Sequence, residues 1–311
     1  MEQDRVSELD VVPQEETGEQ PPPPGKILPI TLFLATVFTT LWAGAYQERV
    51  DHFHPFLGAF KLLWEKPLSL LDGVPFSATL LAILVTHEFG HYILSRIHRV
   101  PSSLPLFIPG LPLFVGTFGA VIRMRAPILS RKALFDIGVS GPIAGFAVAL
   151  VALVIGIRLS SPIRLSEVTN DVALGSPLLF DFFAWVLLDP VPSGYTLNLH
   201  PVAVAAWFGL FITFLNLIPI GQLDGGHVAY ALFGRHQTSL VIAVIPILIV
   251  LGLVGWQGWL LWAGLAGLLG FTHPPVRDPQ AILGRTRIWI AWGVLAIFVL
   301  TFTPVPIIVP R

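Results

Sequence analysis

The chain has 311 residues, of which 54% are hydrophobic and only 12% are charged, and its mean hydropathy is +0.76. Soluble domains carry about 25% charged residues, so this composition excludes an ordinary soluble protein and favours a membrane protein. Cysteine is absent, which excludes disulfides, thiolate-held zinc or iron–sulfur centres, and a cysteine nucleophile.

The first segment, residues 1–26, is predicted to be a disordered tail. It is rich in Glu, Gln and Pro, and residues 1–25 carry seven acidic side chains against the single Arg5. Such a segment has too little apolar surface to offset the entropy lost on ordering. A secretory signal peptide begins with a cationic segment, so the first apolar stretch is expected to be a retained anchor. Residues 27–311 are predicted to form one polytopic membrane domain.

Seven apolar windows follow, and they predict an all-α polytopic membrane protein. A bilayer core about 30 Å thick needs about 20 mostly apolar helical residues. The fifth and sixth windows lie so close together that either could be a short or tilted helix. The windows are 28–46, 76–97, 134–157, 200–219, 239–255, 258–272 and 287–303.

Two further apolar stretches do not have the pattern of membrane spans. Residues 104–122 are interrupted by several prolines and glycines, which predicts a re-entrant loop or a β-hairpin after the second span. Residues 176–188 are short and contain Asp181, which favours an interfacial segment. Tryptophans near the span ends indicate an aromatic belt at the membrane surfaces. They are Trp42, Trp64, Trp207, Trp256, Trp259, Trp289 and Trp292.

The distribution of Lys and Arg predicts the orientation, because cytoplasmic loops retain positive charge. With the N-terminus inside, twelve of these residues fall in inner segments and six in outer ones. The loop 97–133 contributes most of the difference. We therefore expect a multi-pass protein, in the cell membrane, with a cytoplasmic N-terminus and with Arg311 outside.

The second window contains the pattern H-E-x-x-H in His87, Glu88 and His91. Positions i and i+4 lie on one face of a helix, so both histidines can bind one zinc ion. Glu88 lies one position further round, where its carboxylate can accept a proton from water and pass it to a leaving amine. Three ionisable side chains within five residues of a membrane helix are costly and typical of a functional site.

A catalytic zinc site needs a third protein ligand, and Asp224 is the best candidate. It follows the fourth window in an apolar context, before Gly225 and Gly226. Zinc would give this carboxylate a partner at membrane depth. The alternative is that Asp224 only caps a helix that starts at Gly225, and both roles could coexist. His227, three residues later, could also face the metal.

These motifs together resemble the site-2 protease family of intramembrane zinc metalloproteases. The resemblance covers about residues 76–234, which would be the catalytic core, and rests on H-E-x-x-H followed by Asn-Leu-Ile-Pro and Leu-Asp-Gly on a later helix. It implies one zinc ion per chain and cleavage of peptide bonds in or near transmembrane segments, as in regulated intramembrane proteolysis. On matching positions it implies His87, His91 and Asp224 as zinc ligands, Glu88 as general base, and Asn216 as a group that polarises or positions the scissile carbonyl.

Two weaker features also resemble the family. Residues 116–122 look like its membrane-associated hairpin, whose edge could pair with an unwound substrate by strand addition; a structural loop is the alternative. Gly138, Gly141 and Gly145 belong to a small-residue stretch in the third window. This stretch favours close helix packing, and a kink near the site is the functional variant.

The expected partners are a transmembrane protein substrate and the lipid bilayer, with no nucleic acid; the sequence does not indicate an oligomeric state. Many members of the family carry a PDZ or CBS domain, and this chain is expected to have neither. One alternative function is a membrane metal transporter that uses the same His and Asp residues. A transporter would be expected to have further ionisable residues along its path in neighbouring spans, and those spans are almost free of them. A third alternative is an inactive scaffold, which the full set of ligands and base disfavours.

Overall fold

The computed structural model describes residues 25–49, 64, 66–112, 115–124, 128, 130–168, 173–270, 276, 278 and 281–308. The tail expected over residues 1–26 lies outside these residues except for its last two, and so do His52, His54 and His273. The helices are α1 (Ile27–Arg49), η1 (Pro67–Gly73), α3 (Val74–Ile97), α4 (Arg131–Leu159), η2 (Leu165–Glu167), α5 (Leu178–Leu187), α6 (Pro201–Leu217), α7 (Asp224–Phe233), η3 (Gly234–His236), α8 (Gln237–Val254), α9 (Gly258–Leu269) and α10 (Arg285–Thr301). The strands are β1 (Leu106–Pro109), β2 (Thr117–Val121), β3 (Ser161–Arg164), β4 (Ala173–Leu174), β5 (Tyr195–Asn198) and β6 (Ile307–Ile308).

Each of the seven apolar windows contains a helix, and in the part of the chain that the structure describes four helical segments are long and apolar enough to cross a membrane. These four are Ile27–Gln47, Pro67–Ile97, Arg131–Leu159 and Asp224–Val254. The last of them joins α7, η3 and α8 into one stretch. The helices α6 and α9 are apolar but have 17 and 12 residues, and at 1.5 Å per residue the second reaches only about 18 Å. The count of seven spans stays a prediction.

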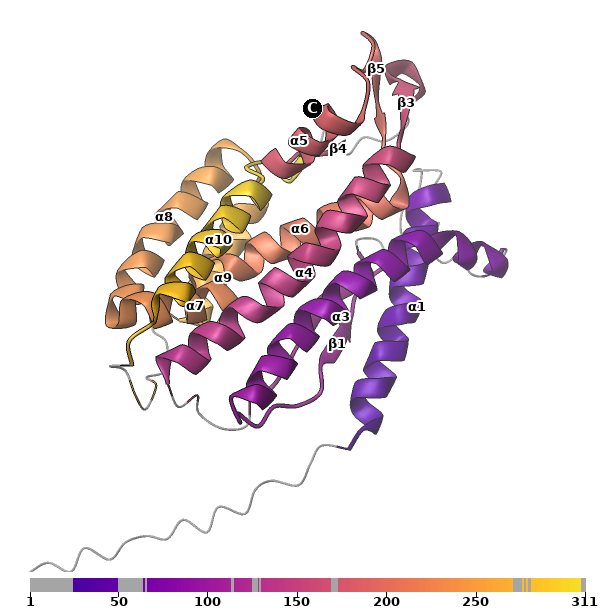
Figure 1. The fold of residues 1–311 in the computed structure, drawn as a ribbon. Coiled ribbons are helices and arrows are strands. Elements are labelled where there is room, and N and C mark those ends of the chain that lie inside the picture. The colour runs from indigo at the N-terminus through magenta and orange to yellow at the C-terminus, as the bar shows by residue number, and fades with distance from the viewer. Residues whose placement is uncertain are drawn as a thin grey trace, which may run out of the picture.

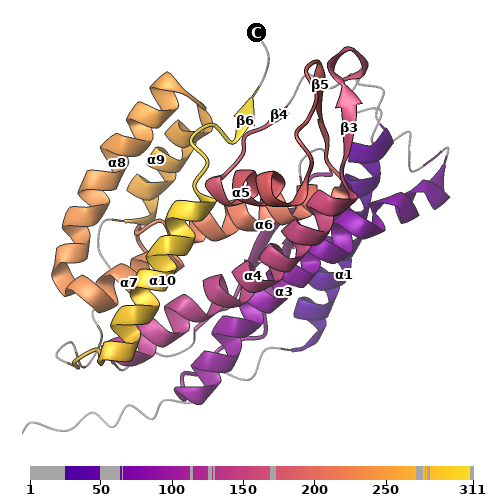
Figure 2. The same ribbon diagram turned by 45° about the horizontal axis from the view of Figure 1, so that its top comes forward.

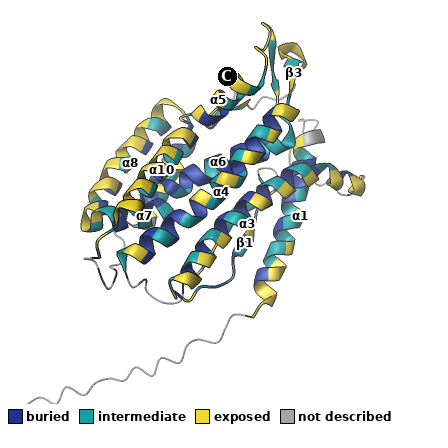
Figure 3. Cartoon of the chain, in the orientation of Figure 1, coloured by how far each residue is buried: buried dark blue, intermediate teal, exposed yellow. Residues whose placement is uncertain are grey.

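The helices lie side by side in an order that puts α4 and α6 in the middle of the protein (Figure 1). α4 packs against α3 on one side and against α6 and α7 on the other. Its first turn is capped by Ser130, whose hydroxyl accepts the N–H of Ala133 at 3.3 Å. α6 is mostly buried, whereas α8 exposes its outer face (Figure 3). This arrangement places the faces of α3, α4 and α6 that meet one another inside the protein.

The proline- and glycine-interrupted stretch after α3 contains a β-hairpin, one of the two forms expected for it. β1 pairs antiparallel with β2, with Phe107 opposite Ala120. The hairpin is held against α1, where Thr39 Oγ1 donates a hydrogen bond of 2.6 Å to the carbonyl of Gly116. Gly116 has φ +77° and its Cα lies against the α1 backbone, so a larger residue fits neither the backbone angle nor the space. A re-entrant position in the membrane stays a prediction.

Short strands and α5 gather at the end of the protein opposite the first residues of α1 (Figures 1 and 2). β3 pairs antiparallel with β5, and β4 pairs antiparallel with β6. The second pair joins the segment after α10 to the segment between α4 and α6. The last described residues of the chain therefore lie on the same side as the connection predicted to be outside.

The prediction of an aromatic belt is wrong for three of the tryptophans, because Trp42, Trp207 and Trp259 are buried. Trp207 is buried, and its indole N–H donates to the carbonyl of Gly175 at 2.6 Å. Trp259 is also buried, and its indole N–H donates to the carbonyl of Pro304 at 2.7 Å. Both rings fill space between helices and satisfy their one donor with a loop carbonyl. Trp289 and Trp292 are exposed on α10, as a belt residue would be.

The pairing of β4 with β6 can be tested with introduced cysteines, because the chain has none of its own. Leu174 and Ile307 lie directly opposite each other across the two strands, within the Cα separation that a disulfide spans. The double variant Leu174→Cys/Ile307→Cys should lose both free thiols on mild oxidation, measured by maleimide labelling. Each single-cysteine variant is the control and should stay reactive. Two reactive thiols in the oxidised double variant would contradict the pairing.

Candidate metal centre

Two histidines and one glutamate lie on the buried side of α3. The helix forms from a continuous apolar run, begins with a proline in its first turn and ends at Ile97. His87 and His91 are separated by four residues, so their rings project from the same face. Both are buried, and their ring centroids are 4.9 Å apart. Glu88 is buried as well.

A tight turn between α6 and α7 brings Asp224 to the same place. α6 ends at Leu217, and the chain reverses through Gly221, which has φ +50°. The first turn of α7 then lies so close to the end of α6 that a Cβ on Gly225 would overlap the carbonyl oxygen of Leu217. Asp224 is the first residue of α7, and Leu223 is the N-cap without a side-chain cap bond. The alternative that Asp224 caps a helix starting at Gly225 is therefore wrong.

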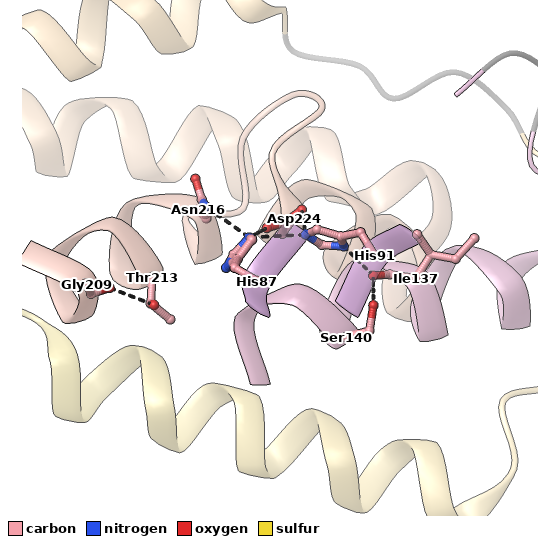
Figure 4. A network of polar contacts seen from close by, with 8 residues as sticks. All are labelled: His87, His91, Ile137, Ser140, Gly209, Thr213, Asn216 and Asp224. Carbon is pink, nitrogen blue, oxygen red and sulfur yellow. Dashed lines mark hydrogen bonds and ion pairs between the residues drawn. The ribbon is translucent and has the colours of Figure 1, made fainter. Parts of the chain in front are cut away.

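The three side chains converge on one point (Figure 4). His87 Nε2 lies 3.2 Å from Asp224 Oδ2, and His91 Nε2 lies 3.2 Å from Asp224 Oδ1. The two Nε2 atoms are also 3.2 Å apart. Within the described residues, these three form the group of side chains that could hold a metal ion.

This geometry fits a zinc ion. Zinc binds imidazole nitrogen at about 2.0–2.1 Å and is usually tetrahedral, which separates two ligand atoms by about 3.3 Å. The Nδ1 of His91 lies 2.7 Å from the carbonyl oxygen of Ile137. A carbonyl oxygen only accepts, so Nδ1 carries the hydrogen and the Nε2 of the neutral ring presents its lone pair. In the neutral ring this lone pair would point at an Asp224 oxygen 3.2 Å away, and either a proton on Nε2 or a metal ion between the two atoms removes the repulsion.

α4 forms the surface on which both imidazoles rest. The carbonyl of Ile137, which accepts from His91, also accepts a hydrogen bond of 2.7 Å from Ser140 Oγ. A Cβ on Gly141 would overlap the His91 ring, and a Cβ on Gly145 would lie 3.1 Å from His87 Nδ1. The small-residue stretch thus permits close packing, as expected. The side chains of His87 and His91 pack directly against its glycines.

Asn216 also reaches the three-residue group. It lies in the last turn of α6, and its Nδ2 is 3.3 Å from His87 Nε2 (Figure 4). Other histidines lie elsewhere: His98 contacts Asp136, and His200 Nδ1 accepts the N–H of Val202 at the start of α6. His227 stands on α7 with its Cβ close to Gly138 of α4, outside the three-residue group.

The direct contacts of α4 with the two histidines were not predicted from the sequence. Ile137 acts through its main-chain carbonyl, so its side chain gives no signal. Gly141 and Gly145 did give a signal, because glycine in a long membrane helix marks a close approach. The sequence alone did not indicate that imidazole side chains are the groups that contact these glycines.

The chain matches the model of a protein family described as Peptidase family M50, over residues 75–254. "Probable zinc metalloprotease EGY2, chloroplastic" from Arabidopsis thaliana is 32% identical over 167 residues, which are 53% of this chain and 30% of that protein. "Probable zinc metalloprotease EGY1, chloroplastic" from Oryza sativa subsp. japonica is 34% identical over 174 residues, which are 53% of this chain and 29% of that protein.

A third relative extends the match at lower identity. "Probable zinc metalloprotease EGY3, chloroplastic" from Oryza sativa subsp. indica is 26% identical over 241 residues, 73% of this chain and 36% of that protein. The chain therefore spans well under half the length of these curated relatives. The family match includes α3, α4, α6 and α7, which carry every residue of the metal centre.

Gly141→Ala should weaken metal binding, because the added methyl group occupies the space of the His91 ring. We expect zinc affinity about tenfold or more below that of the unmodified chain, in the range found when the support of a ligand is removed. The matched control is Gly293→Ala on α10, where an added Cβ meets nothing within 4 Å. Competition with a chromogenic chelator measures both. Equal zinc affinity in the two variants would contradict the packing described for His91.

Proposed function

Because the chain belongs to peptidase family M50, we propose that it is an intramembrane zinc metalloendopeptidase, which hydrolyses peptide bonds in or near transmembrane segments of other membrane proteins. The observation that carries this proposal is the convergence of two imidazole nitrogens and a carboxylate, each pair 3.2 Å apart, from helices distant in the sequence. The relatives named as probable zinc metalloproteases support the same class of activity.

In this proposal His87, His91 and Asp224 bind one zinc ion and leave a position open to solvent or substrate. Zinc in such a site supplies Lewis-acid activation of water and of the scissile carbonyl. Glu88 is buried beside the first ligand; it accepts the proton of the attacking water and later donates it to the leaving amine. Asn216 directs its amide N–H toward the site and holds the scissile carbonyl.

The position of these residues supports cleavage at membrane depth. α3 is part of the candidate span Pro67–Ile97, and α7 begins the candidate span Asp224–Val254. A peptide bond inside a helix is shielded by its own side chains, so the substrate has to unwind locally. The exposed residues of β2, such as Phe118 and Val121, provide a strand beside which an extended segment can pair.

The proposed topology has seven spans, with the N-terminus and the active site toward the cytoplasm and the protein in the cell membrane. The excess of Lys and Arg in the inner segments supports this orientation. The pairing of β4 with β6 supports the odd number of spans, because these strands, which follow α4 and α10, lie on the same side. Regulated intramembrane proteolysis, in which cleavage releases a membrane-tethered regulator, is the proposed role.

Glu88→Gln should abolish cleavage while zinc binding remains. The glutamine keeps the size of the side chain but cannot accept a proton, and loss of such a group lowers a rate by about 10²- to 10⁴-fold. Purified protein reconstituted in liposomes with a panel of single-span substrates gives the measurement, with products identified by mass spectrometry. Bound zinc, measured on the same samples, should equal that of the unmodified chain.

Glu167→Gln is the matched control for Glu88→Gln, because it makes the same change at an exposed position on η2. It should cleave as the unmodified chain does. The proposal fails if the unmodified chain binds zinc and transports it into the liposomes but neither it nor the control cuts any substrate of the panel. That result would instead indicate the metal transporter.

A further inference from the structure

A second polar cluster lies outside the metal centre, where α3, α4 and α10 meet. It consists of His98 at the C-cap of α3, Asp136 in the second turn of α4 and Arg287 in the first turn of α10. We refer to these three residues as the Asp136 cluster. Their side chains are 24%, 17% and 27% exposed, so each is mostly enclosed by protein.

The contacts of the cluster are short and directional. Arg287 donates from Nε to Asp136 Oδ1 at 2.8 Å and from Nη2 to Oδ2 at 2.7 Å. His98 Nε2 lies 2.9 Å from the same Oδ2. A guanidinium that grips both oxygens of a carboxylate is among the strongest ion pairs in proteins and also fixes the orientation of both groups. One carboxylate therefore holds the ends of three helices together.

The cluster lies next to the hydrogen bond that orients His91. Asp136 directly precedes Ile137, whose carbonyl oxygen accepts from His91 Nδ1. On α3, His98 follows His91 by seven residues, about two helical turns. The link between His98 and Asp136 thus spans the same two helices as the link between His91 and Ile137. A shift of α4 along α3 would break both contacts.

Arg287 lies on α10, a helix outside the residues that the family model matches, and it joins this helix to the Asp136 cluster. The match covers residues 75–254, whereas α10 begins at Arg285. Further along α10, Val294 packs in one cluster with Leu134 and Phe135 of α4. The helix is therefore fixed to α4 by apolar contacts along its length and by the ion pair at its start.

We propose that Asp136, held by Arg287, is a positioning residue for the zinc site. The ion pair fixes the position of α4 against α3, and this keeps the Ile137 carbonyl where it orients the His91 imidazole toward the metal. The proposal rests on the proposed role of His91 as a zinc ligand. Asp136 itself contacts neither ligand nor substrate in this account, and it acts through the backbone of the next residue.

The test compares Arg287→Gln with Arg285→Gln in purified protein. Both remove one positive charge from the first turn of α10, but Arg285 is exposed, whereas Arg287 donates two hydrogen bonds to the carboxylate of Asp136. We expect Arg287→Gln to bind zinc about tenfold more weakly, because outer groups that orient a ligand have effects of about 10- to 100-fold. The visible spectrum of the cobalt-loaded protein should shift as well, because it reports ligand geometry. Arg285→Gln should match the unmodified chain in both measurements.

A merely structural ion pair would lower the melting temperature of Arg287→Gln and leave both the zinc affinity and the cobalt spectrum of the folded protein unchanged. That outcome overturns the proposal. Arg287→Lys keeps the charge without the two-pronged grip, so its zinc affinity should lie between those of Arg287→Gln and the unmodified chain. If Arg287→Gln does not fold, Arg287→Lys takes its place in the test. An unchanged zinc affinity of Arg287→Lys would then overturn the proposal.

His91→Ala separates this proposal from the ligand assignment on which it rests. If His91→Ala binds zinc as tightly as the unmodified chain, His91 is not a ligand and the proposed site fails. If His91→Ala loses zinc while Arg287→Gln and Arg287→Lys keep full affinity and an unchanged cobalt spectrum, the ligand stands and only the positioning role fails.

Discussion

The close contact between α3 and α4 is the constraint on which the metal centre depends. Gly90 of α3 faces the backbone at Ser140, and Gly141 of α4 faces the ring of His91. Without side chains at these positions, the two helices approach until the imidazole reaches the Ile137 carbonyl. That hydrogen bond selects the nitrogen with which His91 faces the site. Helix packing, ring orientation and ligand geometry are thus consequences of one contact.

A cluster of ionisable groups is otherwise unfavourable in such an apolar chain. Only 12% of its residues are charged, and unpaired buried charge is costly at membrane depth. Here Asp224 faces two imidazoles and starts α7, where the helix dipole favours a negative charge. The same principle holds at Asp136, whose carboxylate is matched by Arg287. Each of these two partly buried acids has its own partners, supplied by other helices.

Much of this site was predictable because its chemistry lies in side chains at fixed spacing. H-E-x-x-H placed His87 and His91 on one face, whereas the close approach of Gly225 to the end of α6 was not predicted from the Gly-Gly pair. Main-chain roles, such as that of Ile137, leave no pattern in the sequence. The buried Trp207 and Trp259 show a second limit: position near a span end does not tell whether a ring faces lipid or protein.

The central claim is that zinc is held by two imidazoles from α3 and by the carboxylate of Asp224. X-ray absorption at the zinc edge on the purified chain measures this directly. The account predicts one zinc per chain with two histidine ligands and the remainder oxygen, at about 2.0–2.2 Å. In Asp224→Ala zinc occupancy should fall, whereas in Asp181→Ala, an exposed acid on α5, it should not. Fewer than two imidazoles, or full occupancy in Asp224→Ala, would contradict the account.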